Sequence, residues 1–181
     1  MSSFERGSRG LGRQLVPAAI AAFAAALFLA ACTVQPVYGP AAGGGSVSQT
    51  LRAINIDPVD TRVGQVVRNR LIYYFTGGGE PAAEPQYRMA FRVTSSEAAL
   101  GITREGSAAA YAVTVTVSYT IYRIGSDEII LRETARGTAS YDRFSQDFAN
   151  MRAKRDSQNR AAEVAANKVR LRVAAATAVG M

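Results

Sequence analysis

Residues 111–124 read YAVTVTVSYTIYRI, a stretch in which apolar side chains alternate with small or hydroxyl-bearing ones. Alternation of this length predicts a β-strand that buries one face and leaves the other face polar. The apolar face comprises Tyr111, Val113, Val115, Val117, Tyr119 and Ile121. A Gly-Ser-Asp turn follows, so residues 128–141 are expected to return as an antiparallel strand.

Two further strands are expected upstream of this hairpin. Residues 87–93 alternate with the same period, which puts Arg88 and Arg92 together on the polar face. Residues 51–56 form a short apolar stretch that ends at an Asp-Pro turn. Residues 94–108 are polar and lack a period, which predicts a flexible connection between strands.

Two helices complete the pattern. Thr61 is expected to cap a helix over residues 62–75, which ends at three glycines, 77–79. Residues 146–179 contain no glycine or proline and predict a long helix. Its inward side is expected to carry Phe148, Met151, Ala162, Ala165, Val169 and Val173.

These elements follow one another in the order β-α-β-β-β-α. Because each helix must bury an apolar stripe and the sheet offers one apolar face, the expected fold is an α+β two-layer sandwich. Its four-stranded, mainly antiparallel sheet would be packed by two helices on one face. Residues 51–181 would form this single domain, and the second sheet face, rich in threonine and arginine, would meet solvent or a partner.

The first 31 residues have the character of a lipoprotein signal peptide. Three arginines precede an uncharged apolar run over residues 15–31. Leu29-Ala30-Ala31-Cys32 resembles the lipobox of bacterial lipoproteins and contains the only cysteine of the chain. We therefore expect attachment of acyl chains such as palmitate to Cys32, followed by a flexible tether over residues 32–50. The alternative is an uncleaved N-terminal helix with a buried thiol.

The composition excludes several kinds of chemistry. The chain has no histidine, so a Ser-His-Asp triad, a Cys-His dyad and a histidine-ligated zinc are impossible. The glycines at 77–79 lack the Lys-Ser/Thr of a phosphate-binding loop. Asp142 and Asp147 lie near the start of the last helix, where acidic residues favour the helix dipole. We expect no enzymatic activity, no metal and no cofactor.

Basic residues form the one suggestive set in a chain of net charge +7. Export would exclude nucleic acid as a partner, which leaves anionic lipid, phosphorylated glycolipid or an acidic protein surface. Arg104 lies in the connection before the long strand, and Arg152, Lys154 and Arg155 lie early in the last helix. If Arg104 approaches Arg152, the pair would bind an anionic lipid through bidentate phosphate contacts. The alternative is a set of unrelated, solvated charges.

Four segments together resemble the LptE family of outer-membrane lipopolysaccharide-assembly lipoproteins. They are Gln35-Pro36-Val37-Tyr38-Gly39 after Cys32, Gln65-Val66-Val67-Arg68-Asn69-Arg70-Leu71, Ile102-Thr103-Arg104-Glu105-Gly106, and Arg160-Ala161-Ala162-Glu163. The resemblance covers nearly the whole chain after the lipobox. The chain departs from many members in lacking a His or Trp after the lipobox and in having three alanines at 108–110.

The resemblance implies a non-enzymatic role on the periplasmic face of the outer membrane. Such lipoproteins sit as a plug inside the large β-barrel translocon LptD, help it to assemble and bind lipopolysaccharide. By similarity, Arg104 is the best candidate for contact with glycolipid phosphate, and Arg152 is a second one.

Two other functions stay open. The first is an auxiliary periplasmic lipoprotein of a lipid-transport ATP-binding-cassette system, which would share the anchor and the fold but bind a different complex. The second is an enzyme without histidine, such as a cell-wall hydrolase, which would need two carboxylates that converge in a cleft.

Overall fold

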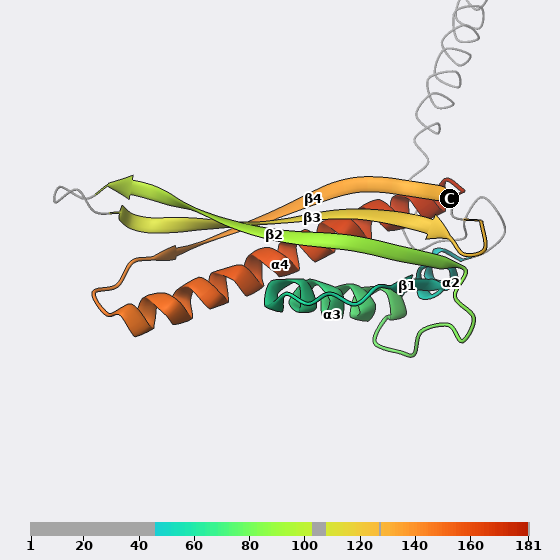
Figure 1. The fold of residues 1–181 in the computed structure, drawn as a ribbon, viewed down its shortest axis with the longest axis horizontal. Coiled ribbons are helices and arrows are strands. Elements are labelled where there is room, and N and C mark those ends of the chain that lie inside the picture. The colour runs from blue at the N-terminus through green and yellow to red at the C-terminus, as the bar shows by residue number, and fades with distance from the viewer. Residues whose placement is uncertain (1–45, 103–107, 127, 181) are drawn as a thin grey trace, which may run out of the picture. The chain divides into compact units, whose positions relative to one another are not determined.

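The strand predicted at residues 111–124 lies inside a four-stranded sheet (Figure 1). The computed structural model describes residues 46–102, 108–126 and 128–180, which belong to one compact unit. The strand order across the sheet follows the chain: β1 (Ile54–Ile56), β2 (Tyr87–Ile102), β3 (Ala108–Arg123) and β4 (Ile129–Asp142). β1 runs parallel to β2, and the other neighbours are antiparallel, which confirms the mainly antiparallel sheet.

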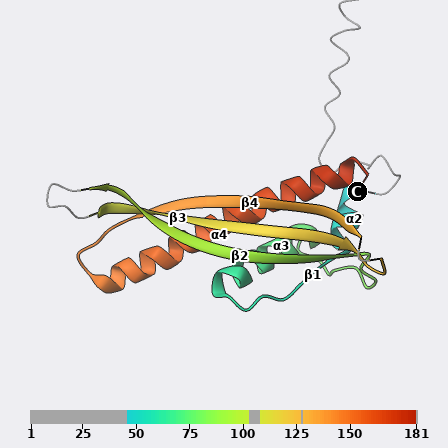
Figure 2. The same ribbon diagram turned by 45° about the horizontal axis from the view of Figure 1, so that its top comes forward.

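Within the described ranges three helices accompany the sheet: α2 (Val47–Arg52), α3 (Arg62–Thr76) and α4 (Asp147–Ala178). Thr61 caps α3 as predicted, since its hydroxyl accepts a hydrogen bond of 3.1 Å from the Gly64 amide. Gly77, in the left-handed conformation at φ 65°, ends the helix. α3 and α4 cover the same face of the sheet (Figures 1 and 2), which confirms the α+β two-layer sandwich. None of the described helices is long and apolar enough to cross a membrane.

The core lies between the sheet and the two long helices. The central strand contributes Val113, Val115, Val117, Tyr119 and Ile121, all buried as the alternation predicts. α4 faces them with small residues, Ala161, Ala162, Ala165 and Ala166, which are fully buried. The small side chains of α4 let the helix approach the sheet closely.

The closest approach is at Gly137 of β4. A Cβ atom added there would lie 2.1 Å from the carbonyl oxygen of Ala161 and 2.6 Å from the amide nitrogen of Ala165. Both neighbours are backbone atoms of α4, so no side-chain rotation relieves the clash. Glycine is therefore required at this position by packing.

The flexible connection predicted over residues 94–108 is wrong for most of its length. β2 continues to Ile102 and β3 begins at Ala108, and the register runs from Tyr87 opposite Arg123 to Leu100 opposite Ala110. Residues 94–101 are exposed, so no apolar alternation marks them as a strand. Backbone pairing with β3, and not burial, stabilises this half of β2.

The strand predicted at residues 51–56 is also partly wrong. Ser46 and Gln49 form a reciprocal capping box, so residues 47–50, assigned to the tether, begin α2 instead. Leu51 lies in this helix and is buried in the core, and the strand begins only at Ile54. The apolar residues of so short a stretch fit either structure, and the cap selects the helix.

The expectation that Phe148 and Met151 face the core is wrong. Their exposed fractions are 70% and 53%. The first turns of α4 extend past the buried part of the sheet, and Ser157 is the first fully buried residue of the helix. The later predicted positions, Ala162, Ala165, Val169 and Val173, are buried as expected.

Candidate functional site

The sheet face opposite the helices is open and polar. Hydroxyl-bearing side chains line it on β3 and β4, and two cross-strand pairs lie within hydrogen-bond distance. The oxygen–oxygen distance is 3.2 Å both for Thr114 with Thr138 and for Ser118 with Thr134. Such pairs stabilise the sheet modestly and leave hydroxyl groups at its surface.

Arginines flank these hydroxyl groups on the same face. Arg88 and Arg92 share the face on β2, as predicted, and Arg132 and Arg136 lie on it from β4. Arg88 is neutralised in part by Asp57 at 3.8 Å. The other three are exposed, and no ion pair within the described residues involves them. The open face is therefore cationic and suits an acidic or phosphorylated partner.

A polar cluster joins the sheet to α4 at the end of the unit where β2 ends, β3 begins and α4 starts, which we call the far end. Glu97 of β2 accepts a 2.5 Å hydrogen bond from the Lys154 ammonium group and a second bond from the Tyr141 hydroxyl. The Tyr141 ring stacks on Tyr111 with 5.5 Å between centroids. Glu97 falls in the stretch predicted to be flexible, so sequence patterning gave no signal for this cluster.

The cluster shifts the acidities of its members. Burial acts to raise the pKa of Glu97, but the hydrogen bonds from Lys154 and Tyr141 and the charge of Lys154 outweigh it and lower the pKa. Burial and the neighbouring Glu97 carboxylate raise the pKa of Tyr141 to about 12. At neutral pH Glu97 is thus charged and Tyr141 is neutral, which suits their hydrogen bond.

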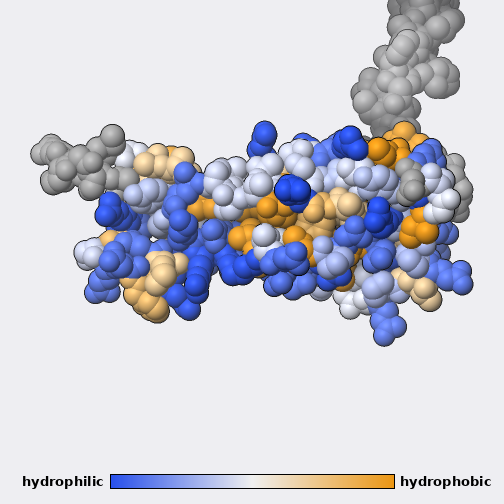
Figure 3. Space-filling model, in the orientation of Figure 1, coloured by the Kyte–Doolittle hydropathy of each residue, from blue (hydrophilic) through white to orange (hydrophobic). Residues whose placement is uncertain are grey.

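Apolar side chains are exposed at the same end of the unit. Phe144, Phe148 and Met151 are each at least half exposed, and Figure 3 shows apolar surface over the start of α4. The Asn150 side chain accepts a hydrogen bond from the Phe144 amide (2.8 Å) and donates one to its carbonyl oxygen (2.9 Å). These two hydrogen bonds hold the Phe144 backbone against the first turn of α4.

Of the residues predicted to contact lipid, the structure describes Arg152 but not Arg104. Arg152 is exposed and lies near the start of α4. Figure 1 shows that α4 starts at the end of the unit where the described parts of β2 and β3 also meet. Arg104 and Cys32, the predicted lipidation site, lie outside the described residues, so the lipidation of Cys32 and the pairing of Arg104 with Arg152 stay predictions. Lys154, assigned to the same basic set, is bound to Glu97 instead.

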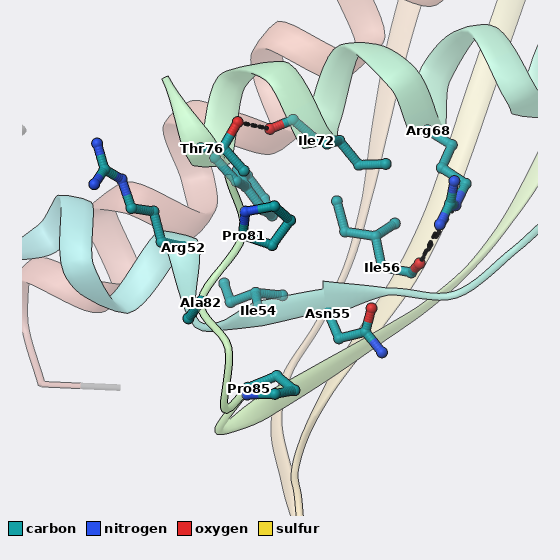
Figure 4. Close-up of a pocket in the computed structure, with 11 residues that line it drawn as sticks. Arg52, Ile54, Asn55, Ile56, Arg68, Ile72, Thr76, Pro81, Ala82 and Pro85 are labelled. Atoms are coloured by element: carbon teal, nitrogen blue, oxygen red, sulfur yellow. Dashed lines mark hydrogen bonds between the residues drawn. The ribbon is translucent and has the colours of Figure 1, made fainter. Parts of the chain in front are cut away.

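A small pocket of about 120 Å³ lies at the opposite end, between β1, the end of α3 and residues 81–85 (Figure 4). Its walls are mainly apolar. Arg68 is half-buried there, and its guanidinium group donates to the carbonyl oxygens of Ile56 and Asp57. This volume accommodates one apolar side chain and is too small for a glycolipid.

A second hollow of about 330 Å³ lies between α2, α3 and α4. The guanidinium carbon of Arg170 lies 4.9 Å from the ring centroid of Tyr74 in its wall. No group of three acidic, histidine or cysteine residues within the described ranges is placed to hold a metal ion.

Comparison with protein-family models matches residues 49–173, more than half of the chain, to the family described as LptE, lipopolysaccharide-assembly. A solved structure of a provisionally described lipoprotein from Caulobacter crescentus CB15 is similar, with a TM-score of 0.61 and 20% identity, over 75% of this chain and 97% of that one. Rare lipoprotein B from Shewanella oneidensis gives a TM-score of 0.52 and 13% identity, over 67% and 92%. At these identities the likeness shows the fold alone. Comparison with curated proteins gives no significant match.

Proposed function

Because the chain belongs to the LptE family of lipopolysaccharide-assembly proteins, we propose that it is an outer-membrane lipoprotein that plugs the LptD β-barrel translocon. In this role it helps the barrel to assemble and takes part in lipopolysaccharide transport to the outer leaflet. Acyl chains on Cys32 hold it at the periplasmic face of the membrane, with the segment before α2 as a tether. The role is non-enzymatic.

The open, cationic sheet face carries this proposal. The lumen of a large outer-membrane barrel is polar, so a partner placed inside it must present polar surface where it meets the wall. The hydroxyl groups of β3 and β4 and the exposed Arg92, Arg132 and Arg136 provide such a surface, while the helices close the other side of the sheet.

The far end of the unit is the proposed glycolipid site. Arg104 and Arg152 are the candidates for contact with lipopolysaccharide phosphates, because arginine binds phosphate through paired hydrogen bonds. The exposed Phe144, Phe148 and Met151 lie at the same end and offer apolar surface to acyl chains.

Co-purification tests the proposal. The full chain, tagged at its C-terminus, is recovered from outer membranes in mild detergent, and unboiled samples are separated by electrophoresis. We expect a tightly held β-barrel of translocon size. Recovery of an inner-membrane transporter would support an auxiliary lipid-transport lipoprotein instead, and recovery of the chain alone would refute both.

A further inference from the structure

The two edges of the sheet differ in how far their backbone hydrogen-bonding groups are occupied. Along β4, side chains of α4 donate hydrogen bonds to backbone carbonyl oxygens of the strand. The donors and acceptors are Ser157 to Ala139 (2.9 Å), Arg160 to Ser140 (2.8 Å), Lys168 to Arg136 (2.9 Å) and Arg172 to Thr134 (2.5 Å). Thr134, Arg136 and Ser140 alternate with the residues that bond to β3, so their carbonyl groups face the outer edge. At these three positions the helix occupies acceptors that another strand would use, which protects this edge.

The outer edge of β2 has no such cover beyond Met89. β1 pairs only with Tyr87–Met89, and the carbonyl oxygen of Met89 accepts the last bond on this side, from the Asp57 amide. Because the N–H and C=O of one strand residue point to the same side, alternate residues after Met89 direct both groups outward. They are Phe91, Val93, Ser95, Glu97 and Ala99. Within the described residues, the backbone of this stretch bonds only to β3.

The sequence of this edge does not discourage pairing. Residues 91–100 contain no proline, and the register with β3 shows no bulge between them. Of the two charged residues, Glu97 is bound to Lys154 and Tyr141 on the helix side, so Arg92 alone points out of the open face. Ser95, Ser96, Ala98 and Ala99 are small and exposed, which lets another backbone approach.

Charge decides which strand fits. In a sheet, directly opposite residues point to the same face, so Arg92 favours an acidic residue opposite it on the incoming strand. Antiparallel pairing with a second copy of β2 cannot supply one, because the residues on the open face there are Thr94, Ser96, Ala98 and Leu100. Glu97 points to the other face. The edge therefore fits a strand of a different protein.

We propose that an extended segment of the partner barrel's chain pairs with the outer edge of β2 over Phe91–Ala99, with an acidic side chain beside Arg92. This inference rests on the proposed function, since it takes its partner from there. Backbone hydrogen bonds would supply the affinity, and the contact with Arg92 would set the register.

Proline substitution tests the edge while leaving the ladder with β3 in place. Ser95→Pro removes an outward N–H, and Ser95→Ala is the matched control that loses the hydroxyl but keeps the N–H. We expect barrel recovery in the co-purification to fall about tenfold for Ser95→Pro and to stay at the wild-type level for Ser95→Ala. The melting temperature of the purified Ser95→Pro protein should stay close to that of wild type.

A photo-crosslinking measurement keeps the test decisive if Ser95→Pro fails to fold. Benzoylphenylalanine replaces Ser96, at the open edge, or Thr138, on the protected β4 strand. An adduct with the barrel from position 96, several-fold stronger than from position 138, supports the inference. The inference is overturned if position 96 gives no adduct with the barrel, or if positions 96 and 138 give adducts of equal strength.

The outcomes separate the two claims. If the wild type recovers no barrel, the proposed function fails. If the wild type and Ser95→Pro recover it equally, the edge inference fails and the proposed function stands. If the isolated wild type is dimeric in light scattering and Ser95→Pro is monomeric, the occupant is a second copy and the proposal is overturned.

Discussion

Lys154 of α4 and Glu97 of β2 lie 57 residues apart in the chain and are joined by an ion pair of 2.5 Å. This pair fixes the first turns of α4 to the half of β2 that no other helix covers. The far end of the unit, where the glycolipid site is proposed, therefore depends on one polar cluster and not on an apolar core.

Glu97→Gln should loosen this end. The Glu97 side chain is 25% exposed and Lys154 is 45% exposed, so solvent screening limits the loss in unfolding free energy to about 1 kcal/mol. Urea denaturation measures it. Glu128→Gln, which breaks the more exposed pair with Arg123, is the control and should cost less. Equal losses would show that the Glu97 pair is an ordinary surface contact.

The same cluster predicts how stability depends on pH. Because folding lowers the pKa of Glu97, its contribution is present above its unfolded value of 4.5 and is lost as the pH falls through the lower, folded value. Folding raises the pKa of Tyr141 from 10.0 to about 12, so its contribution is complete below pH 10 and disappears as the pH rises toward 12.

Denaturation from acidic to alkaline pH checks both limbs. Glu97→Gln should flatten the acidic limb, and Tyr141→Phe should flatten the alkaline one. Unchanged slopes in both variants would contradict the assignment of these shifts to the cluster.

Gly137→Ala should be strongly destabilising. The added methyl group meets two backbone atoms of α4, so the helix must move away from β4, at a cost of roughly 2 to 3 kcal/mol. Gly79→Ala is the control, because its nearest contact is an ordinary 3.5 Å. Thermal unfolding of both proteins distinguishes them, and a Gly137→Ala protein as stable as Gly79→Ala would refute the close approach.

Phe148→Ser should leave stability nearly unchanged, within about 0.5 kcal/mol, because the side chain is 70% exposed. Val169→Ala, in the buried part of the same helix, should cost roughly 2 kcal/mol. Urea denaturation gives both values. A large loss for Phe148→Ser would mean that the start of α4 is buried after all.

Removing charge from the open face should weaken the proposed barrel contact without unfolding the protein. We expect lower barrel recovery for the double variant Arg92→Gln/Arg132→Gln and nearly unchanged stability, since both side chains are exposed. The double variant Arg70→Gln/Arg155→Gln removes two charges from the helix layer and serves as control. Equal recovery of barrel by the two double variants would exclude a specific role for the face.

The layered fold could be predicted from the sequence because a strand that buries one face has apolar residues at every second position. Val113 to Ile121 alternate with hydroxyl residues, and this pattern specified both the central strand and its polar face. The caps of α3 were equally readable at Thr61 and Gly77. These are local signals that need no knowledge of distant residues.

The predictions that were wrong concern segments whose structure depends on residues far away in the sequence. The outer half of β2 buries no side chains, so only its ladder with β3 makes it a strand. Likewise, Phe148 has the spacing of a core residue, but its turn of α4 lies past the buried part of the sheet. The cluster joins Glu97 of β2 to Tyr141 of β4 and Lys154 of α4, which lie more than 40 residues later in the chain, and composition cannot reveal it.

Photo-crosslinking from the centre of the open face shows what this face contacts in the cell. Benzoylphenylalanine at Ser118, exposed in the middle of β3, is activated in intact cells, and the adduct is identified by mass spectrometry. If the chain is a barrel plug, the adduct contains the translocon barrel. An adduct that contains only an inner-membrane transporter or a soluble periplasmic protein would contradict the account.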